Sequence, residues 1–136
     1  MLIVPDVENV SCNYHSRTGE IELSGTARGL LSFAEFLLGD RMTADLPNSK
    51  SNQFSSSNVT QISKLASDGA INFHPNGDNL LVEGNAKCTL LLAESIRNLS
   101  NFKNNPPGYH MHFDSASDQC IDPKCQWELV VMLEID

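Results

Sequence analysis

Basic residues are scarce in this chain, and the deficit excludes whole classes of partner. Its 136 residues include 9 Lys and Arg against 17 Asp and Glu, which gives a formal net charge of −8. Nucleic acids must have their phosphates neutralised by Lys and Arg, so a nucleic-acid-binding role is excluded. An anionic membrane surface is excluded for the same reason. The acidic balance instead favours a soluble protein or a basic protein partner, because complementary charge speeds encounter.

The chain also lacks long hydrophobic runs and a recognisable targeting segment. The start MLIVPDVEN has no basic residue, and its apolar run is too short for a signal peptide. No stretch reaches the length of a transmembrane span. We therefore expect a cytoplasmic protein that does not contact membranes.

Cysteine spacing gives no metal motif. The four cysteines, Cys12, Cys88, Cys120 and Cys125, do not have the spacing of a zinc ribbon. In a reducing cytoplasm we expect them to be thiols. Cys120 and Cys125 flank I-D-P-K, which leaves a labile disulfide or a soft metal site between them as alternatives.

Catalytic patterns are missing as well. No serine lies in a glycine-flanked elbow, no glycine-rich phosphate loop occurs, and Cys88 lies among leucines, as core residues do. A histidine acting as a general base beside Glu83 or Asp114 is an enzymatic alternative. We expect a protein that is not an enzyme and has no cofactor.

The chain is similar to itself at an offset of 59 residues. The segments NYHSRTGEIELSGTARGLLSFAEFL and NFHPNGDNLLVEGNAKCTLLLAESI align without a gap. Asn13 then matches Asn72, and His15 matches His74. A match of this length predicts a duplicated unit, at about residues 10–40 and 69–100.

Each unit has the pattern of strand, turn, strand and helix. SRTGE and HPNGDN predict hairpin turns in which glycine takes a left-handed backbone conformation. Thr26 and Asn85 are suited to cap the helices that follow, and Gly39 ends the first helix. The expected apolar stripes are Leu30, Leu31, Ala34, Leu37 and Leu38 on the first helix, and Leu90, Leu91, Ala93, Ile96 and Leu99 on the second.

The remaining segments complete an α+β domain. A Ser- and Asn-rich stretch at about 47–58 predicts a mobile loop, while 59–65, 109–114 and 127–135 predict strands. We expect one domain over residues 1–136. Its fold would be a two-layer sandwich, with a mostly antiparallel sheet of about seven strands and two helices on one face.

Alternation along the strands predicts which side chains face away from the helices. Successive strand residues point to opposite sides, so YHMHFD at 109–114 places His110, His112 and Asp114 together. The same rule places His15 and His74 on that face, with Glu128, Val130 and Met132. Such a face is acidic, bears histidines and is partly apolar, which favours a contact surface. If the side chains converge, His110, His112, Asp114 and His74 are the candidate ligands for zinc or another divalent transition metal.

The segments YHMHFD and DPKCQWELVVMLE resemble the immunity protein 32 family, and IELSGTARGLLSFAEFL resembles its strand-Gly-helix opening. The resemblance implies a small cytoplasmic bacterial protein that is not an enzyme and that binds and neutralises a cognate toxin. Under this reading the residues predicted to bind the partner are His15, His74, His110, His112, Asp114, Glu128, Val130 and Met132. The alternatives are a metal-binding protein or small metalloenzyme, and a dimerisation or scaffold domain that pairs through Val130 and Met132.

Overall fold

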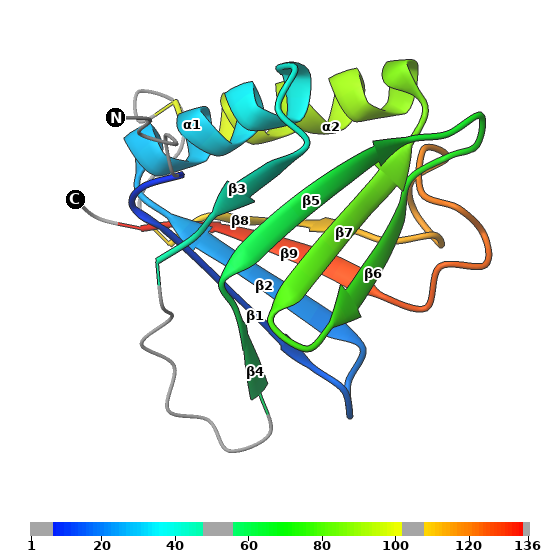
Figure 1. The fold of residues 1–136 in the computed structure, drawn as a ribbon, viewed down its shortest axis with the longest axis horizontal. Helices are drawn as coiled ribbons and strands as arrows, with labels where there is room; N and C mark the ends of the chain where they lie inside the picture. Colours follow the sequence, from blue (N-terminus) through cyan, green and yellow to red (C-terminus); the bar gives the residue numbers. More distant parts are fainter. Residues whose placement is uncertain (1–6, 48–55, 102–107, 135–136) are drawn as a thin grey trace.

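The computed structural model describes residues 7–47, 56–101 and 108–134, which form two helices and nine strands (Figure 1). The helices are α1 (Ala27–Leu38) and α2 (Ala86–Leu99). The strands are β1 (Val10–His15), β2 (Glu20–Gly25), β3 (Thr43–Asp45), β4 (Ser56–Val59), β5 (Gln61–Ala66), β6 (Asn72–Asn76), β7 (Asn79–Gly84), β8 (His110–Phe113) and β9 (Glu128–Leu133). The two helices pack against each other and lie on the same side of the strands (Figure 1). Neither described helix is long and apolar enough to cross a membrane.

The strands form two mixed sheets. The five-stranded sheet has the order β4-β1-β2-β9-β8, and the four-stranded sheet has the order β3-β5-β7-β6. The pairs β2/β9 and β5/β7 are parallel, and the others are antiparallel. The expected α+β sandwich is confirmed. The strands are nevertheless divided between two sheets, and β3 and β4 add to the seven that were expected.

Each sheet combines strands from both halves of the chain. The hairpin β1–β2 precedes α1, yet β2 pairs with β9, which in turn pairs with β8, and both of these strands follow α2. The hairpin β6–β7 precedes α2, yet β7 pairs with β5, which in turn pairs with β3, and both of these strands follow α1. The ββα order therefore occurs twice, and most of the strands that follow each helix join the sheet of the other half's hairpin; β4, which follows α1, pairs with β1 of its own half. That the two units arose by duplication stays a prediction.

The gap-free alignment of the two units does not hold in their first strands. Cys12 pairs with Leu23 in one hairpin, and Phe73 pairs with Val82 in the other, so Cys12 and Phe73 take matching positions. The turn between β6 and β7 is two residues shorter than the one between β1 and β2. A shift of two residues keeps the side chains on their expected sides of the sheet. The glycines Gly19 and Gly77 have the expected left-handed backbone, with φ of 75° and 62°.

One hydrophobic cluster joins both sheets and both helices. Alternation predicts an apolar side for each strand, and most of those residues are buried: Tyr14, Ile21, Leu23, Ile71, Phe73, Leu80, Val82, Phe113, Leu129, Val131 and Leu133. Met111 and Trp127 are only partly buried against the cluster, and Tyr109, also expected on the packed side, is 47% exposed. The expected helix stripes are partly wrong, because Leu31, Leu38, Leu90 and Leu91 are exposed while Phe33, Phe36, Cys88 and Leu92 are buried. Apolar residues occupy most positions of the first helix, so the sequence does not define which side packs.

The helix ends are held by side chains. The Thr26 hydroxyl accepts a hydrogen bond from the Gly29 amide (3.1 Å), and the Asn85 amide oxygen accepts one from the Cys88 amide (2.7 Å), which confirms both caps. At the other end of α1, the Lys64 ammonium donates to the carbonyl of Phe36 (2.7 Å). Residues 56–58 of the expected mobile loop belong to β4, and residues 48–55 lie outside the described residues.

Candidate functional site

The side of the five-stranded sheet that faces away from the core carries the predicted partner residues. The strand register places the side chains of Asn13, His15, Glu20, Glu22, Ser24, His110, His112, Glu128, Val130 and Met132 on this side, which we call the five-strand outer face. His112 lies opposite Val130, which lies opposite Glu22. His110 lies opposite Met132 in a neighbouring row. The expected alternation of β1, β2, β8 and β9 is therefore confirmed.

A histidine–glutamate pair lies at the β8 edge of this face. His112 Nδ1 and Glu128 Oε2 are 2.8 Å apart, so the imidazole N–H can donate to the carboxylate. The His112 side chain is 47% exposed, and the ring of His110 lies 5.1 Å away, centroid to centroid. Both rings are accessible to a partner.

His15 lies on the same face but is buried. It is 5% exposed, and its Nε2 lies 3.3 Å from Glu22 Oε1. The Glu22 side chain is 42% exposed. At this end of the face it is therefore the carboxylate of Glu22, rather than the imidazole, that a partner can reach.

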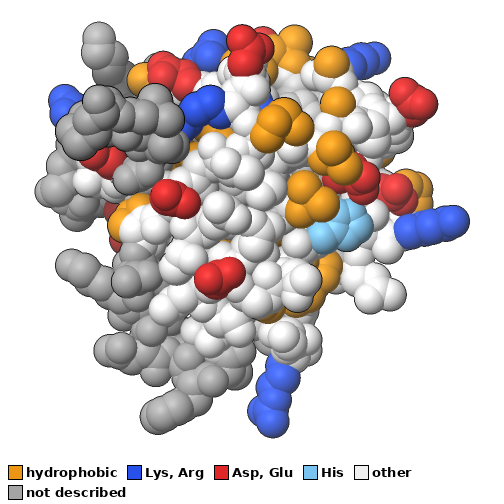
Figure 2. All heavy atoms as spheres, in the orientation of Figure 1, with side chains coloured by type: hydrophobic (Ala, Val, Ile, Leu, Met, Phe, Trp, Pro, Cys, Tyr) orange, Lys and Arg blue, Asp and Glu red, His pale blue; other side chains and the backbone are white. Residues whose placement is uncertain are grey.

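His74 does not share the surface of the other three histidines. It lies on β6 in the four-stranded sheet, where its Nε2 is 3.1 Å from Glu83 Oε1. In Figure 2 the four-stranded sheet faces the viewer, and a histidine side chain is visible beside hydrophobic and acidic side chains. The expectation of one face bearing all four histidines is wrong, because the hairpins β1–β2 and β6–β7 belong to different sheets.

Asp114 orders the turn that follows β8. Its Oδ1 accepts hydrogen bonds from the amides of Ala116 (3.0 Å) and Ser117 (2.9 Å) and from the Ser117 hydroxyl (2.8 Å). These bonds, those from Ser117 first, hold the pKa of Asp114 below its usual value. Within residues 7–47, 56–101 and 108–134, no three His, Cys, Asp or Glu side chains are grouped so that they could hold a metal ion. The predicted ligands His110, His112, Asp114 and His74 are thus not brought together.

The charge of the five-strand outer face is of one sign. Its strands contribute Glu20, Glu22 and Glu128 and include no Lys or Arg. The one cationic strand residue among the described strands, Lys64, belongs to the other sheet and donates to carbonyls at the end of α1. A basic partner surface would meet carboxylates on this face and no Lys or Arg from its strands.

Apolar side chains lie among these carboxylates. Met132 is 38% exposed on this face, while Val130, which lies opposite both Glu22 and His112, is buried. Apolar contact area with a polar and charged rim is the composition found in protein–protein interfaces. The five-strand outer face has this composition.

A separate hollow of about 370 Å³ lies near the end of α1, on the side of the four-stranded sheet. Its lining includes Leu37, Leu38, Met42, Leu65 and Val82, and the polar groups in it are few. Lys64 lies at this hollow, and burial lowers the pKa of its ammonium group. This hollow could not be predicted from the sequence, because its lining residues come from α1, β5, β7 and α2.

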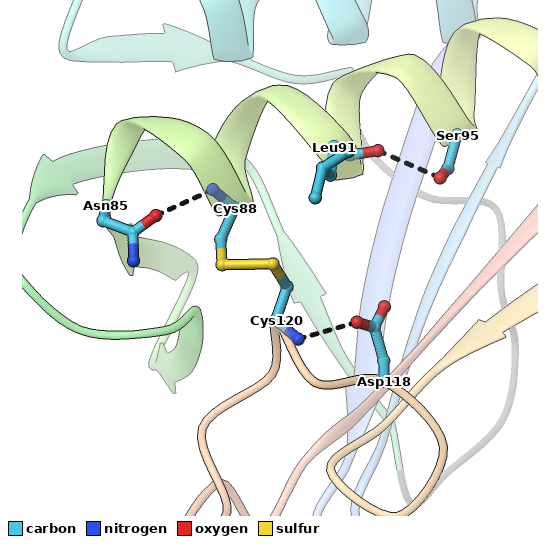
Figure 3. Close-up of a disulfide and its surroundings, with 6 residues drawn as sticks. All are labelled: Asn85, Cys88, Leu91, Ser95, Asp118 and Cys120. Carbon is cyan, nitrogen blue, oxygen red and sulfur yellow. Dashed lines mark hydrogen bonds between the residues drawn. A yellow bond between two sulfur atoms is a disulfide. The ribbon is translucent and has the colours of Figure 1, made fainter.

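The cysteines are arranged differently from the expectation. Cys88 and Cys120 form a disulfide (Figure 3), whereas Cys12 and Cys125 are free and buried. The expected thiols are confirmed for Cys12 and Cys125 alone, and the alternative pairing of Cys120 with Cys125 is wrong. Spacing could not reveal the true pair, since Cys88 and Cys120 are 32 residues apart and meet only because the fold brings α2 against the β8–β9 connection.

Comparison with known protein families identifies the family of this chain. A family model described as Immunity protein 32 matches residues 20–39, which cover β2 and α1, and residues 79–130, which run from β7 into β9. Neither the curated proteins nor the solved structures gave a match. The matched segments make up more than half of the chain and include Glu22, His110, His112, Glu128 and Val130. The chain therefore belongs to the immunity protein 32 family, as the resemblance of its sequence predicted.

Proposed function

We propose that this immunity protein neutralises a cognate toxin by binding it one to one through the five-strand outer face. The observation that carries the proposal is the composition of that face. Met132, an accessible apolar side chain, lies in a sheet whose strands contribute three glutamates and no Lys or Arg. We infer from this composition that the toxin presents a basic surface.

The two kinds of side chain would serve different steps of binding. Carboxylates attract a basic partner over a distance and raise the association rate. Apolar side chains at the centre of an interface supply most of the binding free energy, because they are fully desolvated on contact. Met132 would have this second role, and Glu22 and Glu128 the first.

The direct test uses the toxin domain encoded beside the gene of this protein. We expect co-expression of the two to restore growth, and calorimetry of the purified pair to give a stoichiometry of one to one. The proposal would be contradicted if no such toxin is encoded there, or if the toxin stays active in the presence of excess immunity protein.

The same face is the surface on which a second copy of the chain would pair in the dimerisation alternative. Sedimentation of the wild type and of Met132→Glu separates the two readings. A wild-type monomer favours the toxin-binding reading, whereas a dimer that dissociates in the variant favours self-association.

The metal-binding alternative has its own measurement. Metal analysis of protein purified without an affinity tag would favour that alternative if it finds stoichiometric zinc that is lost in His110→Ala and in His112→Ala. Protein without stoichiometric metal that still binds the toxin supports the present proposal.

A further inference from the structure

The Cys88–Cys120 disulfide fastens the connection between the two strands that carry the histidine pair. Residues 114–127 join β8, which bears His110 and His112, to β9, which bears Glu128 and Met132. Cys120 lies in the middle of this connection, and Cys88 lies in the first turn of α2 (Figure 3). The disulfide is the one covalent link between the connection and the helix layer within the described residues.

Hydrogen bonds hold the connection on both sides of the disulfide. The amide of Ile71 donates to the carbonyl of Cys120 (2.7 Å), and the amide of Asp122 donates to the carbonyl of Ile71 (2.8 Å). The Cys120 amide donates to Asp118 Oδ1 (2.8 Å), as drawn in Figure 3. The connection thus contacts the four-stranded sheet as well as α2, and the disulfide fixes the point where these contacts meet.

The two sulfur atoms differ in a way that suits thiol–disulfide exchange. Cys120 is partly exposed, whereas Cys88 is buried and lies at the amino-terminal end of α2. A thiolate can therefore reach Cys120 more readily than Cys88. Attack on the accessible sulfur of Cys120 therefore makes Cys88 the leaving group.

We propose that the Cys88–Cys120 disulfide is a redox latch, and that a cellular dithiol opens it and thereby weakens toxin binding at the five-strand outer face. The thiolate of the dithiol attacks Cys120 Sγ, the sulfur–sulfur bond breaks, and its electron pair leaves on Cys88 Sγ, which takes up a proton. The second thiol of the dithiol then displaces Cys120 as a thiol. The dithiol is oxidised to a disulfide, and the protein gains two thiols.

Reduction of the disulfide would change the five-strand outer face through β8, the strand that carries His110 and His112. This strand has four residues and is the last strand of its sheet, so its order depends on the segments at its ends. Once the connection is released, β8 and its histidines must be ordered again when the toxin binds. Ordering a loop and a few side chains on binding lowers affinity by about tenfold. The proposal rests on the proposed toxin binding through this face.

Hydrogen exchange and affinity are measured on the full-length protein in oxidised form and after dithiothreitol treatment. We expect reduction to raise deuterium uptake in residues 108–127 severalfold, to leave residues 61–66 and 79–84 unchanged, and to lower toxin affinity about tenfold. Reoxidation should restore both. A Cys88→Ser/Cys120→Ser double variant should resemble the reduced wild type and be insensitive to dithiothreitol.

Cys125→Ser is the matched control, because Cys125 lies in the same connection but not in the disulfide. This variant should respond to dithiothreitol as the wild type does. The latch is overturned if reduction changes neither exchange nor affinity, if affinity is unchanged although exchange rises, or if the double variant still responds. If the toxin binds neither form, the proposed function fails, while the exchange data still decide whether the disulfide holds the connection. Reversible reduction of the wild type keeps the test decisive even if the double variant does not fold.

Discussion

The outer faces of the two sheets are built from the same order of elements but differ in what they offer a partner. On the five-stranded sheet, three glutamates and the exposed Met132 lie on strands without Lys or Arg. On the four-stranded sheet, the side-chain amide of Asn79 donates to Gln61 (3.0 Å) and to Ser63 (3.0 Å), which makes a largely uncharged polar network. The outer side of this sheet also carries the His74–Glu83 pair and the exposed Leu65, so both faces combine carboxylates with apolar surface. They differ in the uncharged network around Asn79 on one face and in the two exposed histidines at the β8 edge of the other.

Met132 and Leu65 show the comparison at single positions. Met132 lies opposite Ser24 in the parallel pair β2/β9, and Leu65 lies opposite Glu83 in the parallel pair β5/β7. Ser24 and Glu83 are 59 residues apart, so Met132 and Leu65 take matching positions. Both are exposed, at 38% and 47%. Substituting each of them by the same residue therefore tests which of the two faces binds the toxin.

The largest effect is expected from loss of the disulfide that holds the connection between β8 and β9. Cys88→Ser with Cys120→Ser should lower the free energy of unfolding by about 3 kcal/mol, because the unfolded chain is no longer cross-linked over 32 residues. Denaturant unfolding under oxidising conditions measures this difference. Cys125→Ser should leave the dependence on dithiothreitol intact, and an equal loss in that variant would contradict the assignment.

The next effect concerns binding at the matching positions. Met132→Glu should weaken toxin binding by about 2 kcal/mol, because it places a charge where apolar area is buried. Leu65→Glu should leave the affinity within about twofold, since the four-stranded sheet lies outside the proposed interface. Calorimetry on both variants decides between the faces. A larger loss in Leu65→Glu would move the interface to the hollow at the end of α1.

A third difference lies beneath the sheets, where Cys12 takes the position that Phe73 has in the other hairpin. Burial, with a smaller contribution from Glu22, raises the pKa of the Cys12 thiol to about 12. The unfolded chain ionises near its ordinary pKa, so stability is lost as the pH rises above about 8.5, by about 1–2 kcal/mol at pH 10. Cys12→Ala should be less stable at pH 7 but should show less of this alkaline loss. An identical pH profile in both proteins would contradict the prediction.

The smallest effect is expected from single charges. Glu128→Gln should slow association with the toxin severalfold at low salt and have little effect at high salt, because ions screen exposed charges. Glu83→Gln is the matched control, since Glu83 pairs with His74 on the other sheet as Glu128 pairs with His112. Stopped-flow association rates over a salt series measure both. If Glu83→Gln slows association equally, the association rate depends on the net charge of the protein and not on the position of Glu128.

Local patterns in the sequence predict much of this fold. Alternation placed His112, Glu128 and Val130 on one side of their strands, and the caps Thr26 and Asn85 were recognisable from residue type and position. These features depend on backbone geometry within a few residues, which a single sequence records.

The features that depend on distant contacts could not be predicted. Nothing in the β1–β2 or β6–β7 segments specifies that their partners come from the other half of the chain, and so the division into two sheets was missed. The separation of His74 from His110 and His112 follows from that division. The Cys88–Cys120 pair was missed for the same reason, because its closeness depends on how the connection crosses toward α2.

Methionine methyl groups offer the most direct test of the proposed interface. The chain has four methionines, among them Met132 on the five-strand outer face, Met42 (51% exposed) at the hollow near α1, and Met111 packed against the core. In protein labelled at these methyl groups, we expect saturating toxin to shift and broaden the Met132 signal and to leave the Met42 signal in place. A shifted Met42 signal with an unchanged Met132 signal would contradict binding through the five-strand outer face.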